Sequence, residues 1–186
     1  MQRDLDRAFA RLEAARQELL ALAASHGEAA FNRRPRPEAW SAAQALEHVM
    51  ISESLSLGYV RKKMQAGNTL PKVGLPSALR LLALQLYLAS PLRARAPKAS
   101  ASVPDHSGLD DLRARWGAIR EDWRTFLESF PPELLGRMVF RHPFAGLLSL
   151  THALGFLQAH LDHHARQVRA ALRAAGESRR EERREA

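Results

Sequence analysis

The sequence contains no cysteine among its 186 residues, and this absence narrows the chemistry that is open to the protein. Without cysteine there can be no disulfide, no iron–sulfur cluster, no thiolate-bound zinc and no cysteine nucleophile. Histidine is therefore the obvious metal ligand, and any sulfur chemistry has to use a thiol that a cosubstrate supplies.

Long apolar runs are also missing. No run approaches the ~18 residues that span a bilayer, and residues 1–6 lack the apolar core of a signal peptide. We therefore expect a soluble, cytoplasmic protein of bacterial type with no membrane partner. Hydrophobic residues make up 46% of the chain, which is enough for a packed core, and one domain is the default at this length.

Acidic residues are outnumbered, with 20 Asp and Glu against 28 Lys and Arg, for a formal net charge of +8. The excess lies in the middle of the chain, from Arg61 to Lys98, whereas the Arg-rich C-terminal end is nearly balanced. A basic protein invites a nucleic-acid hypothesis. However, no DNA-reading motif and no basic stripe interleaved with aromatic residues accompanies the charge. Nucleic-acid binding is therefore the least favoured of the functions considered below.

Helical periodicity dominates the hydrophobic pattern. Apolar residues at helical spacing predict four long helices, over about 2–25, 41–65, 109–127 and 149–175. The signal for strands is nearly absent, and only the segment 138–143 is expected to be extended. Four long amphipathic segments of this kind predict an all-α four-helix bundle.

Local signals place the ends of these helices. Ser41 and Gln44 have the spacing of a capping box at the start of the second helix, and Gly67-Asn68 marks its end. Ser149 can cap the fourth helix, and Gly176 is placed to end it. We therefore expect a bundle domain over residues 1–176 and a charged, disordered tail over residues 177–186.

A long connection divided by prolines joins the second and third long helices. Within it the Leu-rich segment 77–89 carries only one charge, at Arg80, and predicts a short extra helix. Such a helix is expected to be buried in the core, although its leucines could equally cover the interface of a homodimer.

Three of the eight histidines, His160, His163 and His164, lie together in the fourth predicted helix. Residues i and i+4 share a helical face, so His160 and His164 can direct both imidazoles to one point. Relative to an apolar stripe centred on Leu157, these two lie within roughly 60° of the core, whereas His163 lies about 120° away. A divalent metal would satisfy both buried imidazoles, and the alternative is a pair of hydrogen-bonded or partly exposed imidazoles.

A third ligand has to come from another helix, and His48 is the best candidate. The second helix is apolar on two faces, as a central bundle helix can be. One face carries Leu46, Met50, Leu57, Val60 and Met64, and the other carries His48, Ile51, Leu55 and Tyr59. Periodicity leaves open which of the two faces meets the fourth helix.

Three short motifs occur in order along the chain. They are Trp40-Ser41-x-x-Gln44-x-Leu46-x-His48, His142-Pro143-x-x-Gly146-x-Leu148-Ser149 and His160-x-x-His163-His164-x-x-Gln167. In their order and spacing the chain resembles the DinB-like superfamily of metal-binding four-helix bundles, which includes bacillithiol- and mycothiol-dependent S-transferases and isomerases. The resemblance covers roughly residues 2–175.

The resemblance implies a site for one divalent metal near one end of the bundle, formed by His48, His160 and His164. It also implies that the face of the second helix that carries His48 is the one turned toward the metal. His142, His163 and Gln167 then become candidates for side chains that support the ligands, although His163 on its flank could simply be solvated.

Three histidine ligands leave at least one open position on Zn²⁺ and more on Ni²⁺, Fe²⁺ or Mn²⁺. A metal with an open position can activate water for hydrolysis or stabilise the thiolate of a low-molecular-weight thiol. We therefore predict a metal-dependent S-transferase or hydrolase that acts on a small molecule. The alternative is a non-enzymatic metal-binding or stress-associated module that forms a dimer.

No catalytic acid or base can be assigned beyond these ligands. Glu53 lies on a different face from His48 and predicts a structural or rim role, and Asp162 is expected to be solvated. The absence of Glu-x-x-His motifs argues against a ferritin-like di-iron bundle. Basic residues between Arg61 and Lys98 could hold the carboxylates of a thiol cosubstrate.

Overall fold

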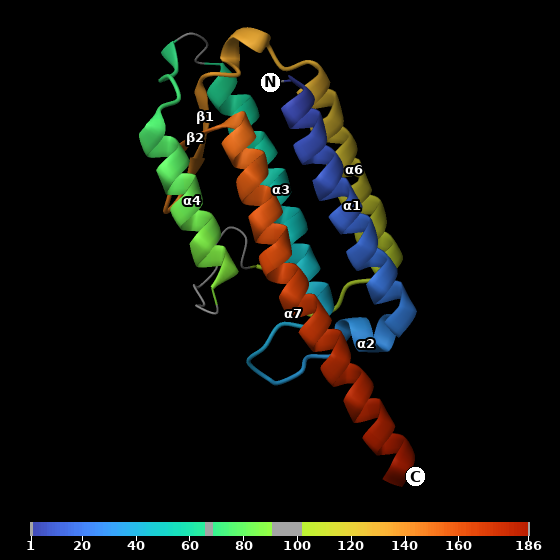
Figure 1. The fold of residues 1–186 in the computed structure, drawn as a ribbon. Coiled ribbons are helices and arrows are strands. Elements are labelled where there is room, and N and C mark those ends of the chain that lie inside the picture. Colours follow the sequence, from blue (N-terminus) through green and yellow to red (C-terminus); the bar gives the residue numbers. More distant parts are fainter. Residues whose placement is uncertain (1, 66–68, 91–101, 186) are drawn as a thin grey trace.

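The computed structural model describes residues 2–65, 69–90 and 102–185 and shows a mostly helical fold (Figure 1). Its elements are α1 (Gln2–His26), α2 (Glu28–Asn32), α3 (Ala42–Met64), α4 (Leu75–Ala89), α6 (Leu109–Glu128), the 3₁₀ turn η2 (Pro132–Leu134), β1 (Met138–His142), β2 (Gly146–Ser149) and α7 (Leu150–Glu185). Among the helices in this part of the chain, none is both long and apolar enough to cross a membrane.

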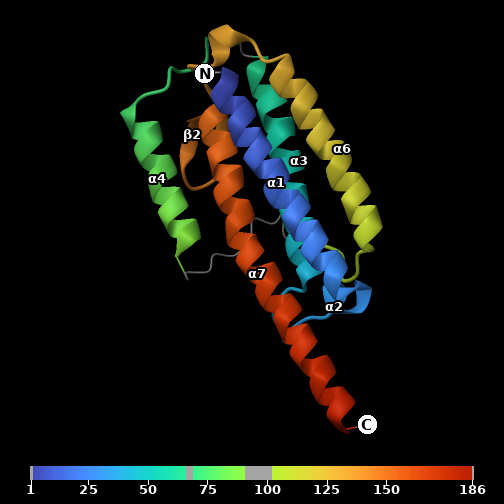
Figure 2. The same ribbon diagram turned by 45° about the vertical axis from the view of Figure 1, so that its right-hand side comes forward.

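The four long helices α1, α3, α6 and α7 lie side by side and share one core (Figures 1 and 2). Helix α7 contacts both α1 and α3, and α6 contacts the same two helices. The core includes the two tryptophans of α6, Trp116 and Trp123, which are no more than 1% exposed. The prediction of a mostly helical chain with four long amphipathic segments is therefore confirmed.

Helix α3 begins at the predicted capping box. The Ser41 hydroxyl accepts a hydrogen bond from the Gln44 backbone N–H, and the Gln44 side-chain oxygen accepts one from the Ser41 backbone N–H. These two bonds satisfy backbone donors that the first turn of a helix leaves unpaired, so they fix where the helix starts. The start in turn sets the direction in which His48 points. The predicted end at Gly67-Asn68 lies outside the described residues.

Helix α7 also starts as predicted but continues further than expected. The Ser149 hydroxyl accepts a hydrogen bond from the His152 backbone N–H, which caps the first turn. At the other end the helix passes through Gly176 and reaches Glu185, and Figure 1 shows it extending beyond the other helices. Glycine costs a helix only about 1 kcal/mol relative to alanine, and no proline follows it. The segment 177–185 is thus helical instead of the expected disordered tail.

A small β-hairpin departs from the all-α prediction. The expected extended segment forms β1, which pairs antiparallel with β2 and lies against α3 and α7. Strand β2 could not be predicted from its sequence, because Gly-Leu-Leu-Ser shows no alternation of apolar and polar residues. At the start of β2, Gly146 has a φ of +71°, a conformation that favours glycine and allows the tight turn.

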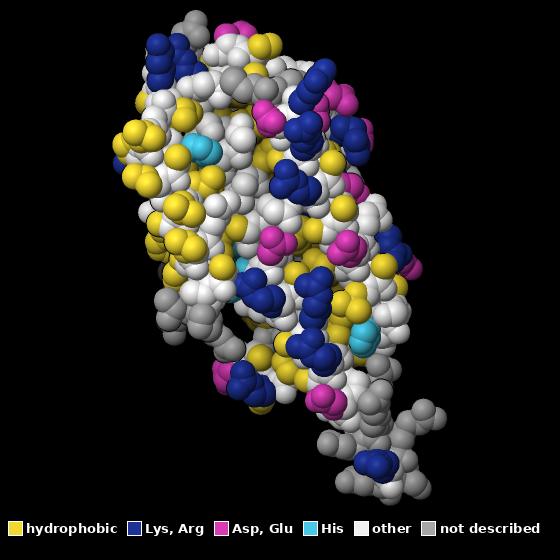
Figure 3. Space-filling model, viewed as in Figure 1, with side chains coloured by type: hydrophobic (Ala, Val, Ile, Leu, Met, Phe, Trp, Pro, Cys, Tyr) yellow, Lys and Arg dark blue, Asp and Glu magenta, His cyan; other side chains and the backbone are white. Residues whose placement is uncertain are grey.

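The Leu-rich segment forms the extra helix α4, but the prediction that this helix is buried was wrong. Only Ser77 and Leu84 are buried, and α4 packs against α7 and β2 with one face. The opposite face exposes Leu75, Leu79, Leu82 and Leu86, at 82%, 64%, 51% and 63%, and Figure 3 shows hydrophobic side chains over this helix. Leucine content alone cannot distinguish a buried helix from a half-exposed one. The homodimer that these leucines led us to expect stays a prediction.

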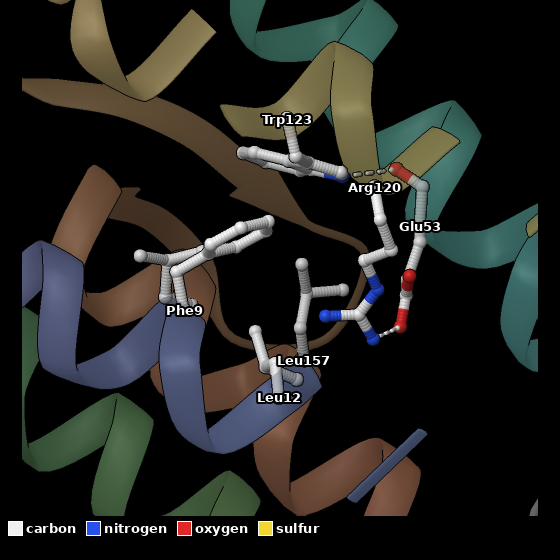
Figure 4. Close-up of a pocket in the computed structure, with 7 residues that line it drawn as sticks. Phe9, Leu12, Glu53, Arg120, Trp123 and Leu157 are labelled. Carbon is white, nitrogen blue, oxygen red and sulfur yellow. Dashed lines mark hydrogen bonds and ion pairs between the residues drawn. The ribbon is translucent and has the colours of Figure 1, made fainter. Parts of the chain in front are cut away.

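A buried ion pair links α3 to α6 inside the core (Figure 4). The Glu53 carboxylate accepts hydrogen bonds from Arg120 Nη2 and Trp116 Nε1, both at 2.7 Å. The Trp123 indole donates to the Glu53 backbone carbonyl at 3.3 Å. The Arg120 guanidinium also lies 5.8 Å from the centre of the Phe9 ring, and the space beside the pair has no room for a water molecule. The hydrogen bonds of the pair therefore come from protein groups, and among the described residues Arg120 Nε has no hydrogen-bond partner.

This pair gives Glu53 the structural role that its helical phase predicted. Burial raises the pKa of Glu53 although Arg120 and Trp116 act in the opposite direction. A charge pair in such surroundings stabilises the fold little relative to apolar residues, but the loss of one partner is costly. The ion pair thus fixes how α3 sits against α6.

We expect Arg120→Met to lower the free energy of unfolding by about 3–5 kcal/mol, because Glu53 then keeps a buried charge without its partner. Urea denaturation measures this loss. The double variant Glu53→Leu with Arg120→Met should recover most of it, since no unpaired charge remains. As a control, Arg113→Ala breaks an exposed pair with Asp110 and should cost less than about 1 kcal/mol. If the double variant lost as much free energy of unfolding as the Glu53→Leu and Arg120→Met variants lose together, the two side chains would not be coupled, and the prediction would be contradicted.

Candidate metal centre

Three histidines from α3 and α7 meet at one point. Nε2 of His160 lies 3.1 Å from Nε2 of His48 and 3.2 Å from Nε2 of His164. One potential ligand atom from each residue lies within 4.8 Å of the other two. The structure therefore brings together the three residues that the sequence analysis selected as metal ligands.

Hydrogen bonding alone satisfies this cluster poorly. An imidazole nitrogen has one in-plane position, which holds either a proton or a lone pair, so it makes one strong hydrogen bond, and two partners can only share that position in a weaker arrangement. Nε2 of His160 faces two other ring nitrogens and can make a strong hydrogen bond to only one of them. A single cation can accept a lone pair from all three nitrogens. Three nitrogens at 2.0–2.1 Å from a tetrahedral zinc ion stand about 3.3 Å apart, close to the observed spacing.

Burial keeps the imidazoles of His160 and His164 in the form that binds metals. His48 is 3% exposed and His164 is 6% exposed. Burial, together with the positive charge that neighbouring histidines would carry, lowers the pKa of His164 to about 3. The same causes lower the pKa of His160 well below its ordinary value. At neutral pH both rings are uncharged, and a neutral imidazole is the state that donates a lone pair to a metal.

Helix geometry explains why the three side chains converge. His160 and His164 are four residues apart on α7, so their side chains lie one above the other on one face. His48 reaches them from α3, so the face of α3 that carries it meets α7 at this level. Further along that face Leu55 and Tyr59 are 49% and 36% exposed. The resemblance identified this face correctly, whereas periodicity could not rank the two.

Aromatic side chains surround the cluster. The centre of the Trp40 ring system lies 5.0 Å from that of His48 and 6.2 Å from that of His164. On the other side the Phe156 ring centre lies 5.4 Å from that of His160. The place of Trp40 at the site could not be predicted from the sequence, because its contact with α7 joins residues far apart in the chain. These rings exclude water from part of the cluster.

Glu47 is a buried carboxylate next to His48 that the sequence analysis did not single out. It accepts hydrogen bonds from the Arg115 guanidinium, one of them at 3.0 Å, and from the Ser107 hydroxyl. Successive residues on a helix point about 100° apart, which turns Glu47 away from the three histidines. It anchors the first turns of α3 to α6 and does not belong to the histidine cluster.

His163 and Gln167 lie beside the cluster on α7 and are bonded to it. The Gln167 side-chain oxygen lies 2.9 Å from Nδ1 of His164, and its nitrogen lies 3.1 Å from Nε2 of His163. Nδ1 of His163 lies 2.8 Å from the Leu88 carbonyl oxygen on α4. His163 is therefore held between two helices, and the alternative of a simply solvated side chain is wrong.

His142 lies in the β-hairpin and closes its turn. The backbone N–H groups of Phe144 and Ala145 both point to its Nδ1 at 3.2 Å and share its one lone pair. Its ring centre lies 4.5 Å from that of Phe156, the same ring that contacts His160. Burial lowers the pKa of His142 to about 4, which keeps Nδ1 free to accept. His142 thus supports the wall of the site and is not part of the histidine cluster.

Asp162 and Arg61 lie apart from the cluster. Asp162 is exposed, as predicted, and accepts a hydrogen bond from Gln158. Arg61 donates to the Asp122 backbone carbonyl on α6, and thirteen residues of helix, or roughly 20 Å, separate it from His48. Arg93, Arg95 and Lys98 lie outside the described residues.

The neutral His142 predicts a pH-dependent stability. In the unfolded chain its pKa is about 6.5, so as the pH falls from about 6.5 to about 4 the unfolded chain takes up a proton that the folded chain does not. The contribution of His142 to the free energy of unfolding is complete above pH ~6.5. Below that pH the free energy of unfolding decreases, by up to about 1.4 kcal/mol per pH unit.

The variant His142→Asn keeps an oxygen that can accept the same N–H bonds but does not titrate. Urea unfolding of chelator-treated protein between these pH values should therefore show a shallower pH dependence for His142→Asn than for the unchanged chain. Equal slopes would mean that His142 is not held neutral by the fold.

Comparison with known proteins agrees with the geometry. A sequence model described as the DinB superfamily matches residues 11–168, a span that runs from α1 into α7 and includes all three clustered histidines. No curated protein and no solved structure matches the chain significantly. Because the family match covers most of the sequence, the chain belongs to the DinB superfamily.

Proposed function

We propose that this protein binds one divalent metal ion through Nε2 of His48, His160 and His164 and uses it to activate a thiol cosubstrate or water. The observation that carries the proposal is the position of His160 Nε2, which faces two other imidazole nitrogens at 3.1 and 3.2 Å. Membership of the DinB superfamily supports it. In this proposal α1, α3, α6 and α7 form a four-helix bundle that holds the site.

The ligand set defines the chemistry that a bound metal would supply. With three neutral ligands a zinc, nickel, iron or manganese ion keeps its double positive charge and an open position, so it acts as a Lewis acid. Among the described residues no carboxylate joins the cluster to lower this charge. The chain has no thiol of its own, so a sulfur nucleophile must come from a cosubstrate. An S-transferase or a hydrolase of small molecules follows from this arrangement.

An apolar strip on α3 gives a place for the substrate. His48, Leu55 and Tyr59 lie on one face of the helix, and the last two side chains remain substantially exposed. Ligand sites combine apolar walls with a few polar groups that fix orientation. The strip therefore favours a substrate with an apolar part that lies along α3 beside the metal.

The first test is metal content and metal-dependent stability. Protein purified without chelator and without a histidine tag should contain about one divalent ion per chain by elemental analysis. After chelation, added Zn²⁺ or Ni²⁺ should raise the Tm, because the ion binds the folded state. His160→Ala should abolish this shift. His26→Ala is the matched control, because the His26 ring lies on α1 and contacts the Leu22 carbonyl. Absence of both metal and shift in the unchanged protein would exclude the site.

The second test concerns the reaction. A transferase should consume a reduced low-molecular-weight thiol together with an electrophile, and chelation or His164→Ala should stop this, because the metal holds the thiolate. A hydrolase should instead cleave its substrate without loss of thiol. Thiol and product are quantified together, with His26→Ala as the active control. Metal binding without either reaction would support the non-enzymatic module and contradict the catalytic part of the proposal.

A further inference from the structure

A chain of hydrogen bonds connects the end of α4 to His164. It runs from the Leu88 carbonyl oxygen to Nδ1 of His163 at 2.8 Å, then from Nε2 of His163 to the Gln167 side-chain nitrogen at 3.1 Å. The Gln167 side-chain oxygen completes it with Nδ1 of His164 at 2.9 Å. The chain ends on the ring whose other nitrogen belongs to the histidine cluster.

The Leu88 carbonyl fixes the first proton in this chain. A carbonyl oxygen can only accept, so Nδ1 of His163 carries a proton and donates it. Arg166 Nη2 donates to the same oxygen at 2.6 Å, and its 3.4 Å approach to His163 Nδ1 is then only a contact. Leu88 lies in the last turn of α4, where carbonyls lack helical partners and attract donors. The other ring nitrogen, Nε2, faces the Gln167 side-chain nitrogen, which can only donate, so Nε2 presents a lone pair.

The amide of Gln167 connects the direction of hydrogen bonding at His163 to that at His164. Since Nε2 of His163 accepts, the amide places its nitrogen there and its oxygen toward His164. That oxygen can only accept, so Nδ1 of His164 carries the proton and Nε2 keeps its lone pair. The reversed amide would need a doubly protonated His163 and would put a proton on Nε2 of His164, where it blocks metal binding.

We propose that Gln167 and His163 are positioning residues that hold His164 in the Nδ1–H tautomer, which leaves Nε2 able to bind the metal. The Leu88 carbonyl at the end of α4 sets the direction of the hydrogen bonds in this chain. The inference rests on the proposed metal site but concerns how the apoprotein prepares one ligand. His160 shows the contrast, because its buried Nδ1 has no hydrogen-bond partner among the described residues. In this proposal the contact between the end of α4 and α7 determines which nitrogen of His164 carries the proton, and so whether Nε2 is free to bind a metal.

The direct experiment reads the tautomers in metal-free protein. Long-range ¹H–¹⁵N NMR spectra of imidazole-labelled, chelator-treated protein at neutral pH distinguish a protonated Nδ1 from a protonated Nε2. We expect both His163 and His164 as the Nδ1–H form. His164 in the Nε2–H form, or as a mixture of both forms, overturns the proposal.

Variants then connect the tautomer to affinity. Gln167→Met removes the polar bridge at similar size, and its Zn²⁺ affinity in a competition titration should fall about 10- to 100-fold, as when a ligand loses its orienting partner. Gln167→Glu keeps an acceptor for His164 and should restore affinity close to that of the unchanged protein. Gln17→Met, on the exposed side of α1, is the control for the substitution itself. Unchanged Zn²⁺ affinity in Gln167→Met overturns the proposal.

The two readouts separate this inference from the metal proposal. If the unchanged protein shows the expected tautomers but binds no Zn²⁺, the metal function fails and the hydrogen-bond chain stands. If the unchanged protein binds Zn²⁺ but His164 is in the Nε2–H form in the metal-free state, the metal function stands and the positioning role of Gln167 and His163 fails.

Discussion

Three imidazole nitrogens that lie within 4.8 Å of one another are the constraint on which the rest of this structure depends. Nε2 of His160 can make a strong hydrogen bond to only one of its two neighbours, and aromatic rings exclude water from part of the cluster. Burial lowers the pKa of His164 to about 3 and that of His160 well below its ordinary value, so protonation of these two rings does not resolve the conflict at neutral pH. A divalent cation is the partner that satisfies all three nitrogens together, which is why the site points to a metal.

The surrounding elements hold this arrangement in place. The capping box at Ser41 fixes the start of α3 and thus the direction of His48, and the Glu53–Arg120 pair sets how α3 lies against α6. On α7 the i, i+4 spacing brings His160 into line with His164. The three histidines themselves lie in the long helices α3 and α7, so they are placed on rigid elements instead of loops. A metal site built in this way would be preorganised, which favours tight binding.

Features that depend on local spacing could be predicted from the sequence, because helix phase and capping act within a few residues. The long helices, the Ser41 capping box and the His160–His164 pair are of this kind, and the match to the DinB superfamily confirms the resemblance. Features that depend on contacts between distant segments could not be read from periodicity. The face of α3 that meets α7 is one example, and the exposure of α4 and the strand pairing of the hairpin are others.

The most direct measurement of the central claim is the X-ray absorption spectrum of the zinc-loaded protein at the metal edge. The account predicts three imidazole ligands per ion, with nitrogens at about 2.0–2.1 Å, and at least one further light atom from solvent or substrate. His160→Ala should lose the imidazole scattering. A spectrum with one imidazole or none around the ion would show that the three histidines do not hold the metal together, and it would contradict the account.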